Sequence, residues 1–150
     1  MSINKDINQA SFKSEYQKAM INLIFTYNWT TEQLKHLFEE ECLTMQQFNI
    51  LRILRGSVTP LSTLQIRERM LDKMSDTSRI VDRLVIKGLV KKITCKTDKR
   101  LVDVTITAKG LNVLKKLDTQ EDKMENILKV LTESEAGILN KLLDKIRQSN

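Results

Sequence analysis

The sequence predicts a mainly helical protein with one small β-hairpin. Apolar residues recur every three or four positions through most of the chain, which is the period of an amphipathic helix. Residues 89–107 differ, because they are rich in alternating and β-branched side chains, as strands are. Three segments also begin with Thr or Ser followed three positions later by Gln or Glu, which is the capping-box spacing of a helix N-terminus.

The composition is typical of one folded domain. A length of 150 residues suits a single unit, so we treat residues 1–150 as one domain. No apolar run approaches the roughly 20 residues that span a bilayer, and the N-terminus lacks the apolar stretch of a secretion signal, so we expect a cytoplasmic protein. Cys42 and Cys95 are too few and too widely spaced for a disulfide framework or a zinc site, and we expect no metal or other cofactor.

The first third of the chain predicts helices. Residues 12–41 form either one long helix or two helices with a break near residues 28–31, since their apolar residues follow a helical period. A capping box at Thr44 and Gln47 starts the next helix, which covers residues 45–55.

A tight turn and a short helix follow. Gly56 ends the preceding helix, because glycine tolerates a left-handed backbone, and Pro60 cannot continue it. A second capping box, Ser62 with Gln65, starts a helix that ends near Met70. The apolar residues of this helix that are available for burial are Leu64 and Ile66.

A second short helix then leads into the hairpin. This helix covers residues 75–87, and Gly88 closes it with a left-handed cap. Residues 89–94 and 101–107 are the two strands, joined by the polar and basic turn 96–100. The inward-facing residues of the helix are predicted to be Ile80, Val81, Leu84 and Val85.

Helical periodicity returns after the hairpin. It runs from Leu111 to Leu131, and a third capping box at Thr132 and Glu135 starts a final helix. Two short helices followed by a basic hairpin make a winged helix-turn-helix, here residues 45–110, whose second helix can enter the major groove of DNA.

The distribution of charge points to the same segment. Residues 61–110 carry twelve Lys and Arg against six Asp and Glu, whereas the rest of the chain carries thirteen of each sign. The whole excess of +6 therefore lies in this segment. A local basic excess suits a polyanion such as DNA, although an ordinary solvated surface is the alternative.

The chain resembles the MarR family of transcriptional regulators from about residue 12 to residue 146. The most specific matches are Ser-Arg-Ile-Val-Asp-Arg-Leu at 78–84, Lys-Gly-Leu-Val at 87–90, Asp-Lys-Arg at 98–100 and Ile-Thr-Ala-Lys-Gly at 106–110. The family usually has Leu where this chain has the Ile of the last motif, and the wing of this chain is shorter than in many members.

The resemblance implies a regulator that binds double-stranded DNA as a homodimer and recognises a near-palindromic operator, and we expect a repressor. In the family the terminal helices, here 12–41 and 111–147, intertwine about a twofold axis. Many relatives also bind a small aromatic or apolar acid near these helices. The residues that could line such a pocket are Tyr27, Trp29, His36 and Phe38, although helical aromatic residues more often form core.

The candidate DNA contacts lie on the second short helix and on the wing. Arg79 is the first candidate for a base edge, because a guanidinium can bridge the two acceptors of guanine. Asp98 could hold Arg100 against a phosphate or in the minor groove, or these two residues could only stabilise a surface turn. Arg83 could contact DNA, or it could instead pair with Asp82. The predicted contacts are Ser75, Thr77, Ser78, Arg79, Arg83, Lys96, Lys99 and Arg100.

Other classes of function have less support. One histidine and the lack of a phosphate loop, metal cluster or nucleophile motif argue against an enzyme. The family's usual redox-sensing cysteine lies early in the first helix, where this chain has none, and Cys42 follows three glutamates that disfavour a thiolate. The remaining alternative is a winged-helix module that binds an acidic protein partner.

Overall fold

The computed structural model describes residues 2–94 and 102–148, and within them the protein is mainly helical with a small antiparallel sheet. The predicted fold class is therefore confirmed. In chain order the elements are α1 (Ile3–Asp6), α2 (Glu15–Glu39), α3 (Met45–Arg55), β1 (Leu61–Ser62), α4 (Thr63–Arg69), α5 (Thr77–Ile86), β2 (Val90–Thr94), β3 (Val102–Ile106), α6 (Ala108–Asp118), α7 (Glu121–Asn126) and α8 (Glu133–Arg147).

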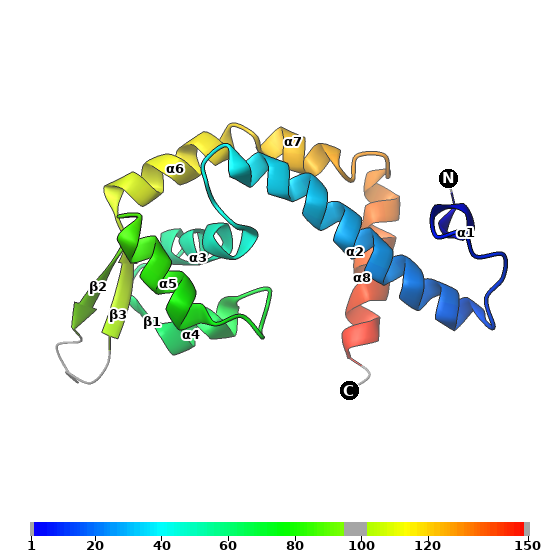
Figure 1. Ribbon diagram of the computed structural model, residues 1–150, viewed down its shortest axis with the longest axis horizontal. Coiled ribbons are helices and arrows are strands. Elements are labelled where there is room, and N and C mark those ends of the chain that lie inside the picture. Colours follow the sequence, from blue (N-terminus) through cyan, green and yellow to red (C-terminus); the bar gives the residue numbers. More distant parts are fainter. Residues whose placement is uncertain (1, 95–101, 149–150) are drawn as a thin grey trace.

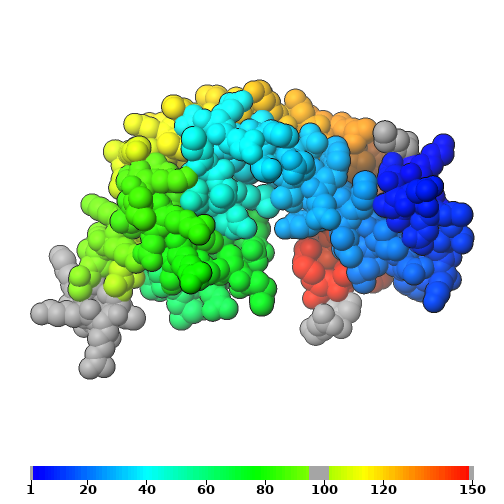
Figure 2. Space-filling view, in the orientation of Figure 1, coloured from blue at the N-terminus to red at the C-terminus, as the bar shows by residue number. Residues whose placement is uncertain are grey.

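The chain forms an arch with a compact lobe at one end (Figure 1). Helices α3, α4 and α5 build this lobe together with the sheet, whose strand order is β1-β3-β2. Helices α2, α6 and α7 run away from the lobe across the top of the arch, and α8 descends at its other end. Figure 2 shows that the molecule is hollowed beneath the arch, between the lobe and α8.

All three predicted capping boxes are present, at α3, α4 and α8. In each box the hydroxyl of the cap accepts a hydrogen bond from the backbone amide three residues on, and the Gln or Glu side chain accepts one from the backbone amide of the cap. At α8 the backbone amide and hydroxyl of Thr132 hold the pKa of Glu135 below its ordinary value, because both donate to the carboxylate. Such a cap stabilises a helix by about 1 kcal/mol.

Helix α2 is continuous over 25 residues, so the alternative with a break near residues 28–31 is wrong. The segment contains no Pro or Gly that would end a helix. The Thr31 hydroxyl donates to the backbone oxygen of Tyr27 at 2.7 Å, which satisfies that hydroxyl inside the helix. Neither α2 nor any other helix within residues 2–94 and 102–148 is both long and apolar enough to cross a membrane.

The helical pattern after Leu111 is interrupted, contrary to the prediction of a single run. Helix α6 ends at Asp118 and α7 begins at Glu121. At the junction the Thr119 hydroxyl donates to the Lys116 carbonyl at 2.6 Å. The backbone amide of Thr119 also donates to this carbonyl, at 3.2 Å, so Thr119 closes the last turn of α6.

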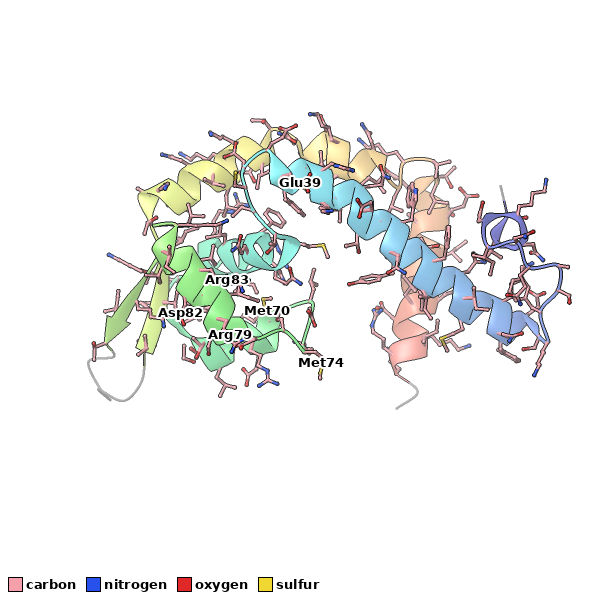
Figure 3. All side chains as sticks on the ribbon, viewed as in Figure 1. Glu39, Met70, Met74, Arg79, Asp82 and Arg83 are labelled. Carbon is pink, nitrogen blue, oxygen red and sulfur yellow. The ribbon has the colours of Figure 1, made fainter. Side chains whose placement is uncertain are left out.

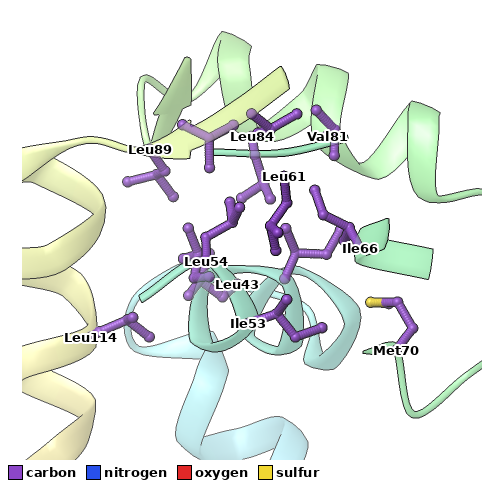
Figure 4. Close-up of a cluster of buried hydrophobic side chains, with 14 of the residues drawn as sticks. Leu43, Ile53, Leu54, Leu61, Ile66, Met70, Val81, Leu84, Leu89 and Leu114 are labelled. Carbon is purple, nitrogen blue, oxygen red and sulfur yellow. The ribbon is translucent and has the colours of Figure 1, made fainter. Parts of the chain in front are cut away.

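The hydrophobic core lies in the lobe and holds α5 (Figure 4). Val81 and Leu84 of α5 are fully buried, and so are Ile66 of α4 and Val104 of β3. Leu114 of α6 is fully buried in the same cluster. The core therefore anchors both the second helix of the helix-turn-helix and the start of the arch.

Two residues that the sequence predicts to be buried are exposed. Leu64 is 62% exposed, because it precedes the buried Ile66 by two positions and residues two apart on a helix point in different directions. Val85 is 37% exposed, because it lies beside Leu84 at the edge of the buried face of α5. Ile80 is partly buried and packs against the core, as predicted.

The predicted hairpin is confirmed, and a third strand joins it. Strands β2 and β3 are antiparallel, with Val90 opposite Ile106. Strand β1 pairs with the other edge of β3, where Leu61 lies opposite Val104. The sequence does not predict β1, because two residues are too few to show a period.

Three glycines lie at helix ends in the lobe. Gly88 has a φ of +70°, so its predicted left-handed conformation is confirmed. Gly56 has a φ of −77°, so the same expectation for it is wrong. Gly110 has no room for a side chain, because a Cβ would lie 2.3 Å from the carbonyl oxygen of Leu89 and 2.8 Å from Cγ1 of Ile106. The first turn of α6 thus lies directly on the backbone that follows α5.

We expect Gly110→Ala to lower the free energy of unfolding by about 1–3 kcal/mol, because the new methyl group collides with backbone that cannot move aside. Gly56→Ala is the matched control, since its Cβ would lie 3.6 Å from the Arg52 carbonyl oxygen, an ordinary contact. Urea unfolding followed by circular dichroism measures both variants. Equal midpoints for Gly110→Ala and wild type would contradict the close approach of α6.

Candidate nucleic-acid interface

The outward face of α5 carries the candidate contacts. Because Val81 and Leu84 occupy the buried face, Arg79 and Arg83 lie on the exposed side of the helix. The side chain of Arg79 is 81% exposed. Figure 3 shows Arg79, Asp82 and Arg83 along α5. The helix therefore presents two guanidinium groups to a partner outside the lobe.

The N-terminus of α5 is capped by Asp76. Its Oδ1 accepts a hydrogen bond from the Arg79 backbone amide at 3.2 Å, and its Oδ2 lies 3.3 Å from the Arg79 Nε. Ser78 is exposed in the first turn, and the hydroxyl of the half-buried Ser75 donates to the Asp72 carbonyl at 2.8 Å. The carboxylate that could repel a phosphate here is thus committed to the helix cap and to an arginine.

Thr77 differs from the other predicted contacts on α5. It is only 4% exposed, so the expectation that it shares the outer surface is wrong. Thr77 lies four residues before Val81 and seven before Leu84, which places all three on one face of the helix. Its hydroxyl has no hydrogen-bond partner within the described residues.

Asp82 on the exposed face is also neutralised. Its carboxylate pairs with the ammonium of Lys92 on β2 and not with Arg83. Arg83 forms no ion pair within the part of the chain that the structure describes, so its guanidinium is available to a ligand. The pair between α5 and β2 also ties the helix to the hairpin beside it.

The predicted wing residues Lys96, Asp98, Lys99 and Arg100 lie outside the described residues. The described part of the hairpin adds two basic side chains that the sequence analysis does not single out, Lys91 and Lys92, both on β2 and both exposed. The basic excess thus continues from α5 onto the adjoining strand.

Sequence reasoning also misses Arg67. This exposed residue of α4 lines a hollow of about 390 Å³ at the N-terminus of α5, together with Met74 and Ser75. Figure 3 shows Met74 in the turn between the two helices. The sequence did offer one signal for Arg67, because it is a basic residue in the last turn of α4, the first helix of the helix-turn-helix.

The structure does not bring together the four aromatic residues predicted to line a ligand pocket. Phe38 is buried in the lobe, where its ring stacks on Phe48 with centroids 4.6 Å apart. His36 lies on the surface of α2 between two glutamates, and Tyr27 is 60% exposed. Trp29 lines a separate hollow between α1 and α2. Within one chain these residues therefore form no common site.

Proteins of known family and structure share this fold. The model of the MarR family matches residues 43–102, which cover α3 to the start of β3. A MarR transcription factor from Planctomyces limnophilus is 32% identical, with 89% of this chain and 98% of that chain covered and a TM-score of 0.68.

Two further solved structures share the fold at lower identity. A mutant of MarR from E. coli complexed with operator DNA is 22% identical with a TM-score of 0.80, covering 91% of this chain and 99% of that chain. BpsR from Bordetella bronchiseptica, whose DNA binding is regulated by 6-hydroxynicotinic acid, is 18% identical with the same TM-score, covering 94% of this chain and 100% of that chain. At these identities the likeness shows the fold alone.

Proposed function

Because the chain belongs to the MarR family, we propose that it represses transcription by binding a near-palindromic operator as a homodimer. At the level of the family it is a DNA-binding transcription regulator. The observation that carries the proposal of operator binding is the exposed face of α5 with its two arginines. This helix lies in residues 61–110, the segment that contains the whole positive excess of the chain. Such a surface suits the phosphate-lined major groove.

Each exposed group on α5 has a proposed role. Arg79 reads a base edge, since its guanidinium can bridge two acceptors of guanine, and Arg83 binds a phosphate farther along the groove. Ser75 and Ser78 bind a phosphate at the helix N-terminus, where the positive end of the helix dipole favours an anion. Thr77 is left out of this set because its side chain is buried. The wing supplies Lys96, Lys99 and Arg100, with Asp98 holding Arg100.

Exposed apolar stripes on α2 and α8 support the homodimer. No residue of α8 is buried within the described chain, although its sequence carries a regular apolar stripe. A second copy that covers these stripes removes apolar surface from water, at about 25 cal/mol per Å². A twofold axis would then set two α5 helices about 34–36 Å apart, one turn of DNA. The exposed members are Tyr16, Met20, Ile24 and Tyr27 of α2 and Ile138, Leu142 and Ile146 of α8.

Control by a small molecule is part of the proposal. BpsR, which shares the fold, is regulated by a small aromatic acid. In this chain α6 lies directly on the backbone that follows α5. A ligand that binds where the lobe meets α6 and shifts α6 would therefore change the orientation of α5. We therefore expect an effector of this class to release the operator.

We expect Arg79→Ala to weaken binding to the preferred operator by about 1–3 kcal/mol and to leave binding to random DNA nearly unchanged. Arg79→Lys is the matched control, because it keeps the charge and loses the two-pronged hydrogen bonding of the guanidinium. Fluorescence anisotropy on a DNA fragment selected from genomic DNA, and on a scrambled copy, measures both variants. A loss of equal size on the two fragments would assign Arg79 to the phosphates instead.

The affinity for DNA should fall steeply with salt. Each phosphate contact releases condensed counterions, so the logarithm of the binding constant should fall with the logarithm of salt concentration by about 0.9 per contact. The same anisotropy measurement on random duplex DNA across a salt series gives this slope. A flat response would contradict DNA binding and favour an acidic protein as the partner.

Leu142→Glu should convert the dimer to a monomer, because it places a charge on the apolar stripe of α8, where Leu142 is 54% exposed in the single chain. Asn140→Glu, on the polar side of the same helix, is the control and should stay dimeric. Sedimentation velocity distinguishes one chain of 17.4 kDa from two. A monomeric wild-type protein, or a Leu142→Glu variant that remains a dimer, would rule out this interface.

A further inference from the structure

Two helices connect the lobe with the rest of the arch, and α6 is the one that continues toward α8 (Figure 1). The other is α2, whose Phe38 enters the core of the lobe. Helix α6 contacts α3, and its Leu114 and Leu117 are buried in the same core. Beyond α6, neither α7 nor α8 buries a residue within the described chain. The contact between α3 and α6 therefore helps to set the angle of the lobe to the arch.

An ion pair joins the ends of these two helices. Arg55 is the last residue of α3, and Asp118 is the last residue of α6. The Arg55 Nη1 donates to both carboxylate oxygens of Asp118, at 2.9 and 2.7 Å, although the two residues lie 63 positions apart in the chain. Their side chains are 37% and 44% exposed, so the pair contributes little to the stability of the fold. Its effect is on the direction of α6.

The apolar contact and the ion pair constrain α6 in different ways. Burial of Leu114 and Leu117 holds α6 against the lobe, but hydrophobic attraction has no preferred direction and permits small rotations of one helix on the other. The hydrogen bonds between Arg55 and Asp118 require a short distance and a nearly straight geometry, so they favour one angle. They also act at the C-terminal end of α6, where a rotation about the buried leucines moves the helix most.

The other polar contacts at the end of α6 reach the end of α2. Lys116 pairs with Glu41 at 3.2 Å, and the Gln120 side-chain amide donates to Glu40 at 2.7 Å. Both glutamates directly follow α2, a helix of the arch, so these contacts do not reach the lobe. Within residues 2–94 and 102–148, no second ion pair joins α3 to α6. The pair of Arg55 is therefore the ionic link from the lobe to the end of α6.

We propose that Arg55 and Asp118 are positioning residues, which hold the lobe at one angle and thereby make the protein selective for the spacing of its two half-sites. This proposal rests on the proposed function, because both lobes of a homodimer must reach their half-sites at once. One base pair added between the half-sites moves them about 3.4 Å apart and rotates one of them by about 34° around the duplex. A lobe that can rotate more freely follows this change at a lower cost.

Distances between spin labels test the angle of the lobe without DNA. After both native cysteines are replaced by serine, labels on the exposed positions Glu68→Cys in α4 and Asn140→Cys in α8 report the distance between the lobe and α8. Dilution with unlabelled protein leaves one labelled chain in most dimers, so a monomer gives the same readout. We expect a narrow distribution of distances with the ion pair intact and a broader one in Arg55→Ala and in Asp118→Ala. Equal widths would overturn the proposal.

Operator fragments with one base pair added or removed between the half-sites test the effect on recognition. We expect wild type to bind each altered fragment at least tenfold more weakly than the parent fragment. In Arg55→Ala and Asp118→Ala this ratio should shrink by about threefold to fivefold, which one partly exposed ion pair can supply. The two substitutions change the net charge in opposite directions, so long-range attraction to DNA cannot explain a shared change. Asp122→Ala, an exposed acid of α7 without an ion pair in the described residues, is the control and should keep the wild-type ratio.

A charge swap separates loss of the pair from loss of either residue. Arg55→Asp combined with Asp118→Arg forms the pair in reverse, so it should restore the narrow distances and the wild-type ratio of affinities. Equal ratios in wild type and both single variants, or a broadening that the swap does not reverse, would contradict the proposal. A wild-type protein that is monomeric, or that does not bind the parent fragment, fails the proposed function, and the label distances then decide whether the pair holds the lobe.

Discussion

The burial of one face of α5 is the constraint on which the proposed interface depends. Val81 and Leu84 are fully buried among residues from α3, α4 and the sheet, and each such side chain stabilises the fold by about 1.5–3 kcal/mol. Helical geometry then fixes the directions in which the other side chains of the helix point. Arg79 and Arg83 must face outward, and Thr77, which shares the face of Val81, must face inward.

Both ends of α5 are fixed as well, and the acidic residues at its N-cap and in its second turn are paired with cations. Asp76 caps the N-terminus and pairs with Arg79, while Asp82 pairs with Lys92 on β2. At the other end the Thr107 hydroxyl donates to the Gly88 carbonyl at 2.8 Å. A helix held in this way can present its two arginines while both of its own carboxylates are neutralised by a cation.

Local signals predicted most of the helices and the hairpin, whereas strand β1 depends on distant residues. The capping boxes at Thr44, Ser62 and Thr132 and the left-handed Gly88 require only neighbours within a few positions, and all are present. Strand β1 forms because Leu61 pairs with Val104 of β3, about forty residues later in the chain. A pattern within a few neighbouring residues cannot predict such a pairing. The buried Thr77 is different, since its spacing from Val81 was visible in the sequence but its polar side chain suggested the surface.

Hydroxyl-radical footprinting on a DNA fragment selected from genomic DNA tests the central claim most directly, because it shows where the paired α5 helices and their lobes lie on the duplex. The account predicts two protected stretches on one face of the DNA, with centres about 10 base pairs apart or a multiple of that spacing. One uninterrupted stretch without this period, or no protection at protein concentrations that saturate the DNA, would contradict it.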